Sequence, residues 1–329
     1  MNSVKYILFL FMMTATAYPQ LLPNLGGQRV GTSSAQFLKI GTGPRAVAMG
    51  QAFVAIANDA EALYYNPAGL TQFNRNELFF SNTRWLVDIQ MEFLGMVYHL
   101  DEVNSVGLAI TYLHTEDMEE TTELYPYGTG RYFSYSDALV GLSYARKMTD
   151  KFSFGITVKY LYETLAELNI NALLFDLGTY YRTGWESIRF AVTVTNFGND
   201  IAPAGSFQYK NLENEVTTRD SFQKFPPPIL FRVGIAAEFL QTEEHLLSGS
   251  IQLNHPNDNV ENVNIGLEYW WQDLFALRGG FTSARLEEDF SAGFGLNVPV
   301  SALDIGVDYA FSNFGRLGYV NRFALSIRF

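Results

Sequence analysis

Apolar and polar residues alternate with a period of two along most of this chain. In the closing stretch RFALSIRF, the residues Phe323, Leu325, Ile327 and Phe329 occupy every second position. Successive side chains of a β-strand point to opposite faces, so these four share one face. The same alternation recurs over residues 154–162, 188–194 and 303–311. The pattern therefore predicts strands with one apolar face and one polar or small face.

From Glu77 onward, runs of this kind predict fourteen strands. Their expected ranges are 77–87, 91–100, 104–115, 132–147, 151–164, 170–183, 187–198, 228–240, 245–255, 261–271, 274–284, 289–298, 301–312 and 319–329. Bacterial outer-membrane barrels have an even number of antiparallel strands, and closure removes the edges that an open sheet would expose. We therefore expect an all-β transmembrane β-barrel over residues 77–329. A secreted all-β protein is the alternative.

The lengths of the connections support the barrel and predict its orientation. Connections after the even-numbered strands are short, whereas the two longest, residues 116–131 and 199–227, follow odd-numbered strands. Outer-membrane barrels have short periplasmic turns and longer extracellular loops. We therefore expect the Gram-negative type of outer membrane, with both termini in the periplasm and the long loops outside.

Composition narrows the choice of function. Aromatic residues make up 15% of the sequence and charged residues 17%, whereas soluble domains carry about 25% charged residues. The net charge of −12 argues against nucleic-acid binding, which needs a basic surface. With no cysteine and four scattered histidines, the sequence predicts no metal site and no cofactor. No Ser, His and Asp combination has a supporting motif, so we expect no enzymatic activity.

The first twenty residues form a candidate secretory signal. Lys5 precedes an apolar run over residues 6–13, and the small residues 15–17 follow. This is the order of regions in a signal peptide, and the run is too short to span a bilayer as a helix. We expect cleavage after Ala17 or near Gln20.

Charged residues within the strands occupy the face opposite the apolar one. Placing Arg or Lys on the lipid face at mid-membrane costs about 2–4 kcal/mol, so these residues are expected to face the lumen. They are Lys159, Asp176, Arg189, Arg232, Glu268, Arg278, Asp304, Asp308 and Arg322. Both signs are present, which indicates a narrow or occluded lumen. They are either ion pairs that hold the barrel or part of a transport path.

Residues 21–76 read as a compact segment of small residues, short helices and turns. Pro44 suits the first turn of a helix, and Gly50 would end it. Pro67 disfavours helix at Asn66 and predicts an exit turn there. We expect this segment to plug the mouth of the barrel, with Arg45 bound to a buried acid or to carbonyl groups.

A longer motif lies within this segment. The stretch FLKIGTGPRAVAMGQAFVAIANDAEALYYNPAGL, residues 37–70, resembles the N-terminal signature of the PorV/PorQ family of FadL-type barrels. The shared elements are Phe37-Leu38, the Gly-x-x-x-Arg-Ala-x-Ala-Met-Gly run, Ala-Phe-Val-Ala and Asn-Pro-Ala-Gly-Leu. The remainder of the chain matches in architecture, because FadL-type barrels also have fourteen strands and an N-terminal plug.

The resemblance implies two alternative functions. PorV and PorQ are parts of the type IX secretion system, so the barrel would bind a translocon or secreted cargo, with loop 199–227 as the candidate contact. FadL-type barrels pass hydrophobic compounds through the outer membrane. Transport would require an apolar pocket between plug and wall, whereas a polar, salt-bridged lumen would count against it.

The remaining site candidates follow from these alternatives. Residues that line the pocket or form the plug would be Phe37, Leu38, Arg45, Phe53, Leu63, Tyr64 and Asn66. The C-terminal Phe329 resembles the signal that the barrel insertion machinery reads. The other expected partner is outer-membrane lipid.

Overall fold

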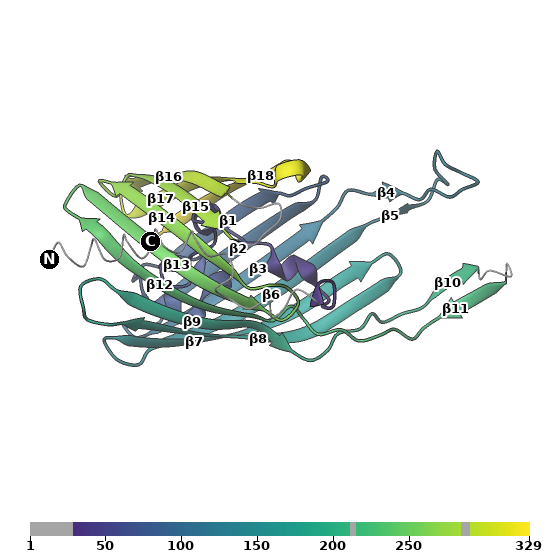
Figure 1. The fold of residues 1–329 in the computed structure, drawn as a ribbon, viewed down its shortest axis with the longest axis horizontal. Coiled ribbons are helices and arrows are strands. Elements are labelled where there is room, and N and C mark those ends of the chain that lie inside the picture. The colour runs from purple at the N-terminus through teal and green to yellow at the C-terminus, as the bar shows by residue number, and fades with distance from the viewer. Residues whose placement is uncertain (1–28, 211–214, 284–289) are drawn as a thin grey trace.

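The strands close into one antiparallel barrel in the computed structural model, which describes residues 29–210, 215–283 and 290–329 (Figure 1). The strands in chain order are β1 (Glu77–Arg84), β2 (Gln90–His99), β3 (Asn104–His114), β6 (Tyr135–Lys147), β7 (Phe152–Leu165), β8 (Leu168–Arg182), β9 (Arg189–Gly198), β12 (Leu230–Gln241), β13 (His245–Pro256), β14 (Asn262–Trp271), β15 (Phe275–Thr282), β16 (Phe290–Val300), β17 (Leu303–Asn313) and β18 (Tyr319–Arg328). β1 pairs with β18 and completes the ring. The prediction of a fourteen-stranded antiparallel barrel is confirmed.

Alternation along each strand sorts the side chains between the two faces of the wall. In β18, Phe323 and Leu325 are exposed on the outside, while Arg322, Ala324 and Ser326 are buried on the inside. The apolar face therefore points away from the lumen, as a lipid-facing surface requires. No helix in the described ranges is long and apolar enough to cross a membrane.

The two ends of the barrel differ. At one end, the connections 100–103, 148–151, 183–188, 242–244, 272–274 and 301–302 are short. The opposite, long-loop end carries two hairpins, β4 (Met118–Glu119) with β5 (Tyr132–Phe133) and β10 (Phe207–Lys210) with β11 (Val216–Arg219). Both hairpins extend well beyond the barrel in Figure 1. Residues 116–131 and 199–227 thus contribute to hairpins rather than to unstructured loops.

The segment before β1 runs through the lumen from the long-loop end to the short-turn end. It contains η2 (Gln36–Lys39), α2 (Pro44–Ala48), α3 (Ala62–Tyr65) and η3 (Pro67–Thr71), and a further short turn, η4 (Gly315–Leu317), lies between β17 and β18. At the long-loop end, the backbone nitrogen of Ser34 donates to the Pro226 oxygen at 3.0 Å. At the other end, the side chain of Asn76 accepts from the His99 nitrogen at 3.0 Å. The expected signal peptide, residues 1–20, lies outside the described residues, as do residues 21–28 of the expected plug.

Candidate functional site

The plug segment, defined here as residues 29–76, packs directly on the backbone of the wall. A Cβ atom added to Gly280 of β15 would lie 1.9 Å from the backbone nitrogen of Gly50, and one added to Gly178 of β8 would lie 2.2 Å from Oδ1 of Asn66. Only glycine permits such an approach. Other wall glycines in contact with the plug at distances too short for a Cβ are Gly107, Gly155, Gly234, Gly266 and Gly293. Backbone and side chains of the plug therefore fill the middle of the lumen.

An ion network joins the plug to the wall around Arg45 of α2. Its Nη1 lies 2.6 Å from Asp59 Oδ2, and its Nη2 lies 2.7 Å from Glu268 Oε1 on β14. Arg278 of β15 contacts the same glutamate at 2.7 Å and Asp308 of β17 at 2.5 Å. Burial alone would lower the pKa of Arg45, but Glu268 and Asp59 raise it well above its usual value. The guanidinium therefore stays charged and fixes α2 against β14.

Glu61 explains the glycine that precedes the Pro44-Arg45 pair. Its carboxylate accepts hydrogen bonds from the backbone nitrogens of Arg45 at 3.1 Å and Ala46 at 2.8 Å, at the start of α2. Gly43 has φ of 78°, and a Cβ there would lie 2.2 Å from Cδ of Glu61. Burial, and then the nearby charge of Asp59, raise the pKa of Glu61 well above its usual value. The motif thus encodes a helix start covered by a buried carboxyl group.

Asn66 makes the exit turn. Its Oδ1 accepts from the Ala68 nitrogen at 3.1 Å, while its Nδ2 donates to the oxygens of Val54 at 2.9 Å and Thr179 at 3.2 Å. One amide therefore begins η3, holds the plug together and attaches it to β8.

The apolar candidates of the plug are packed rather than arranged around open space. Phe53 meets Tyr65 edge-to-face at 5.4 Å, and Leu63 fills the space beside Gly95 and Gly107 of the wall. The Tyr64 hydroxyl donates to the Leu38 oxygen at 2.9 Å. Phe53 and Leu63 belong to one buried cluster with the wall. Both side chains are buried in contact with that cluster.

Most of the charged residues expected in the lumen are buried and partnered. Lys159 lies 2.7 Å from Asp176, and Arg189 pairs with Glu238. The Arg232 guanidinium lies 5.8 Å from the ring centroids of both Tyr64 and Tyr65. These contacts tie strands β7, β8, β9 and β12 to one another or to the plug.

Two further expected lumen charges contact the plug segment. Arg322 reaches the plug, since its Nε donates to the Gly41 oxygen at 3.3 Å. Asp304 is the second residue of β17 and pairs with the half-exposed Arg75 at the short-turn rim. Parity placed Asp304 on the inner face, but its position at a strand end brings it to the rim.

Glu77 connects the plug, the first strand and the last strand. Its Oε2 accepts from the Ala60 nitrogen at 2.9 Å, and its Oε1 accepts from Nε of Arg328 on β18 at 3.2 Å. Glu77 is fully buried. Phe329, which follows Arg328, is exposed, and its nitrogen donates to the Asn76 oxygen at 3.0 Å. Sequence reasoning missed Glu77 because it opens a strand and has no local partner.

A second apolar cluster lies at the long-loop end of the lumen. It contains Phe37 and Leu38 of the plug, the wall residues Met91, Leu113, Leu139, Leu161, Ile170 and Leu174, and Ile201 of the connection between β9 and β10. Asp258, in the β13–β14 loop, holds η2 above this cluster by accepting hydrogen bonds from Gln36 at 2.8 Å and Lys39 at 2.9 Å, and from Ser33. Burial alone would raise the pKa of Asp258, but these donors hold it below its usual value.

Two acidic residues beside this cluster were missed by the sequence analysis. Asp137 of β6 and Glu163 of β7 are register partners on the inner face and are buried. The parity rule that selected Lys159 on β7 also applies to both of them, so the signal was present in the sequence.

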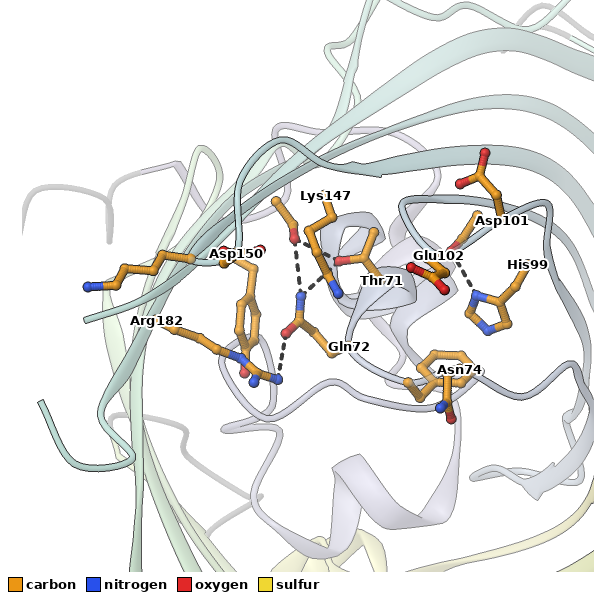
Figure 2. Close-up of a pocket in the computed structure, with 14 residues that line it drawn as sticks. Thr71, Gln72, Asn74, His99, Asp101, Glu102, Lys147, Asp150 and Arg182 are labelled. Carbon is orange, nitrogen blue, oxygen red and sulfur yellow. Dashed lines mark hydrogen bonds between the residues drawn. The ribbon is translucent and has the colours of Figure 1, made fainter. Parts of the chain in front are cut away.

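A polar cavity opens at the short-turn end, where the plug passes into β1 (Figure 2). Its volume is about 700 Å³. Gln72 lies at its centre, donating to Thr71 Oγ1 at 2.8 Å and accepting from Arg182 at 3.0 Å. Residues of both charges surround it: Asp101, Glu102, Lys147, Asp150, Lys151 and Arg182. Such a lining suits water and polar groups rather than an apolar ligand. Within the described ranges, no three His, Asp or Glu residues form a group suited to a metal ion.

Solved structures of other proteins share this fold. The Pseudomonas putida toluene transporter TodX matches with a TM-score of 0.57 at 13% identity, covering 88% of this chain and 97% of that one. The Ralstonia pickettii toluene transporter TbuX gives 0.55 at 13% identity over 88% and 97% of the two chains. A Pseudomonas aeruginosa FadL homologue gives 0.56 at 11% identity over 88% and 98%. At these identities the likeness establishes the fold alone.

The family is established by sequence. No curated protein matches this chain. The family model described as "Type IX secretion system protein PorV" matches residues 24–255, a range that includes the whole N-terminal motif and the strands through most of β13. The resemblance noted from residues 37–70 is confirmed. This chain is an outer-membrane β-barrel with a FadL-type fold, and it belongs to the PorV family.

Proposed function

We propose that this barrel is a non-enzymatic partner-binding component of type IX-like protein secretion, which contacts a translocon or secreted cargo at its long-loop end. The observation that carries this proposal is the pair of hairpins that extend from that end (Figure 1). Their exposed large side chains include Leu124, Tyr125, Tyr127, Tyr132, Tyr209 and Val216. Aromatic side chains are enriched at protein interfaces, and a monomeric surface has little other use for them.

The filled lumen supports the same proposal. Plug backbone sits on wall glycines, and Arg45 links α2 to β14 through a buried ion pair. A hydrophobic compound moving along the barrel axis to the periplasm would have to displace both contacts. Residues 21–76 would then act as a permanent plug, and the charged lumen residues would hold it in place.

Orientation and insertion complete the proposal. The short turns and the C-terminus would face the periplasm, the hairpins would face outward, and residues 1–20 would be removed as a signal peptide. Phe329 would serve the insertion machinery, since it is exposed beside the seam between β1 and β18. Outer-membrane lipid would contact the apolar outer face.

Replacing residues 206–220 with a short Gly-Ser turn tests the main proposal. The tagged variant and the wild type would be purified gently from the native envelope, and co-purifying proteins identified by mass spectrometry. We expect secretion partners with the wild type only, while the variant still inserts and migrates as a folded barrel. A matched control replaces the exposed residues 315–317 at the same end of the barrel. Partner recovery that is unchanged by loss of the hairpin contradicts the proposal.

Transport of a hydrophobic compound is the second candidate. It is favoured by the apolar cluster at the long-loop end, where Phe37 and Leu38 are buried with six wall residues and Ile201, and by the fold shared with TodX and TbuX. Extraction of the purified barrel followed by lipid mass spectrometry tests it. Bound hydrophobic compounds, together with their uptake by barrel-containing liposomes, would favour transport; a barrel free of them in both assays would exclude it.

A further inference from the structure

The carboxyl groups of Asp137 and Glu163 differ from the other buried acids of the lumen, which have either a basic partner or, for Glu61, two backbone N–H donors. Glu268 and Asp308 pair with Arg278, Asp176 with Lys159, Glu238 with Arg189, and Glu77 with Arg328. By contrast, neither Asp137 nor Glu163 forms an ion pair with any residue in the described parts of the chain. Burying an uncompensated charge is costly, so such a pair requires a cation or a proton.

The two groups face each other. Asp137 and Glu163 are directly opposite across the β6–β7 ladder, a position in which like charges repel. Asp137 is 0% exposed and Glu163 is 5% exposed. The Tyr135 hydroxyl donates to Asp137 Oδ2 at 2.5 Å. Oδ1 of Asp137 and Oε2 of Glu163 are both buried without a hydrogen-bond partner. Two unused acceptors on opposed carboxyl groups are a ready site for a donor of positive charge.

The surroundings indicate which kind of cation fits. Calcium takes six to eight oxygen ligands, and magnesium requires octahedral coordination. The neighbouring inward residues are instead apolar: Leu113, Leu139, Leu161 and Ile170 belong to the buried cluster at the long-loop end. An ammonium group has three donors, enough to reach both free oxygens. A hydrocarbon attached to it would contact the apolar cluster.

We propose that Asp137 and Glu163, with Tyr135, form a binding site for a small amphipathic amine, whose ammonium group lies between the carboxylates and whose hydrocarbon part lies against the apolar cluster. The plug residues Phe37 and Leu38 complete that cluster. The site lies in the long-loop half of the lumen and does not depend on the hairpins. The site would bind a small ligand in addition to the proposed partner, and it is tested independently of the partner-binding role.

The proposal is tested with benzylamine and benzyl alcohol, two probes that differ in charge and share a ring. Binding to the full-length, detergent-purified barrel would be measured by calorimetry and by saturation-transfer NMR. The wild type is expected to bind benzylamine more tightly than benzyl alcohol. The double variant Asp137→Asn/Glu163→Gln is expected to bind benzylamine at least tenfold more weakly. Asp304→Asn at the opposite rim is the matched control and is expected to bind as the wild type does.

Three results would overturn the proposal. Benzylamine that binds no better than benzyl alcohol shows that charge is not recognised. Equal binding by the wild type and the double variant shows that the pair does not form the site. Calcium or magnesium that binds the wild type and is lost in the double variant shows a metal site instead. Because Asn and Gln keep the shape of the acids, folding is checked by heat-dependent gel mobility, and the single variants Asp137→Asn and Glu163→Gln serve if the double variant fails to fold.

Discussion

The middle of the lumen and its long-loop end differ in how their buried carboxyl groups are neutralised. In the middle, every carboxylate of the Arg45 network has a basic partner, and plug backbone presses on glycines. At the long-loop end, apolar side chains surround two carboxyl groups that have no basic partner in the described ranges. The acids of the first region are neutralised by basic residues of the protein, whereas the two acids of the second have no such partner. Buried polar groups without partners are uncommon in proteins, and each of them calls for an explanation.

The strongest contrast is expected at Glu268 in the middle region. Glu268→Gln removes the anion between Arg45 and Arg278 and leaves two buried guanidinium groups facing each other. Breaking one partner of a buried ion network costs about 3–5 kcal/mol. Urea unfolding of the detergent-refolded barrel measures this loss. A change below 1 kcal/mol would mean that Asp59 and Asp308 suffice for the two arginines.

The glycine contacts give the next largest effect. Gly280→Ala places a methyl group where Gly50 lies, whereas Gly279→Ala points outward, with no atom within 4 Å of the new Cβ. Overpacking of this kind costs about 1–3 kcal/mol, so Gly280→Ala should destabilise the barrel and expose the plug to protease. Gly279→Ala should match the wild type in both assays. Equal protease resistance of the two variants would show that the plug shifts freely.

Glu163→Gln sharpens the comparison, because it is the same chemical change as Glu268→Gln at the other region. Here the substitution relieves repulsion from Asp137 and removes an unpaired buried charge. We expect a gain of about 1 kcal/mol in unfolding free energy without ligand. The sign of the change in unfolding free energy decides the test. A loss of stability like that at Glu268 would show that Glu163 has a partner in the folded protein.

The smallest effect concerns the cover of the long-loop end. Because donors hold the pKa of Asp258 below its usual value, its contribution is present above the unfolded value of about 3.9 and is lost as pH falls through the lower folded value. An exposed or partly exposed pair of this type contributes about 1 kcal/mol or less. The backbone amides of η2 should therefore show higher hydrogen-exchange protection factors, which correct for the intrinsic pH dependence of exchange, at neutral pH than near pH 2. In Asp258→Asn the protection factors should be low at both pH values, and high protection in this variant would show that Asp258 does not hold η2 in place.

The sequence predicted the wall far better than the contacts inside it. Period-two alternation is local, so it located fourteen strands, and the inward parity of Lys159, Glu268 and Arg322 could be read directly. The partner of Arg45 could not be read, because Glu268 is distant in the chain and the choice depends on how α2 docks on β14. Asp137 and Glu163 had the same parity signal, but only the ladder register reveals that they are opposite each other. Long-range docking is a tertiary property, which local pattern does not encode.

Glu77 has a consequence for biogenesis. Its carboxylate is satisfied only when Ala60 has reached it from inside and Arg328 from the last strand. The plug supplies one of these bonds and the last strand supplies the other. Seating of the plug and closure of the β1–β18 seam are therefore coupled through one side chain, and each event favours the other.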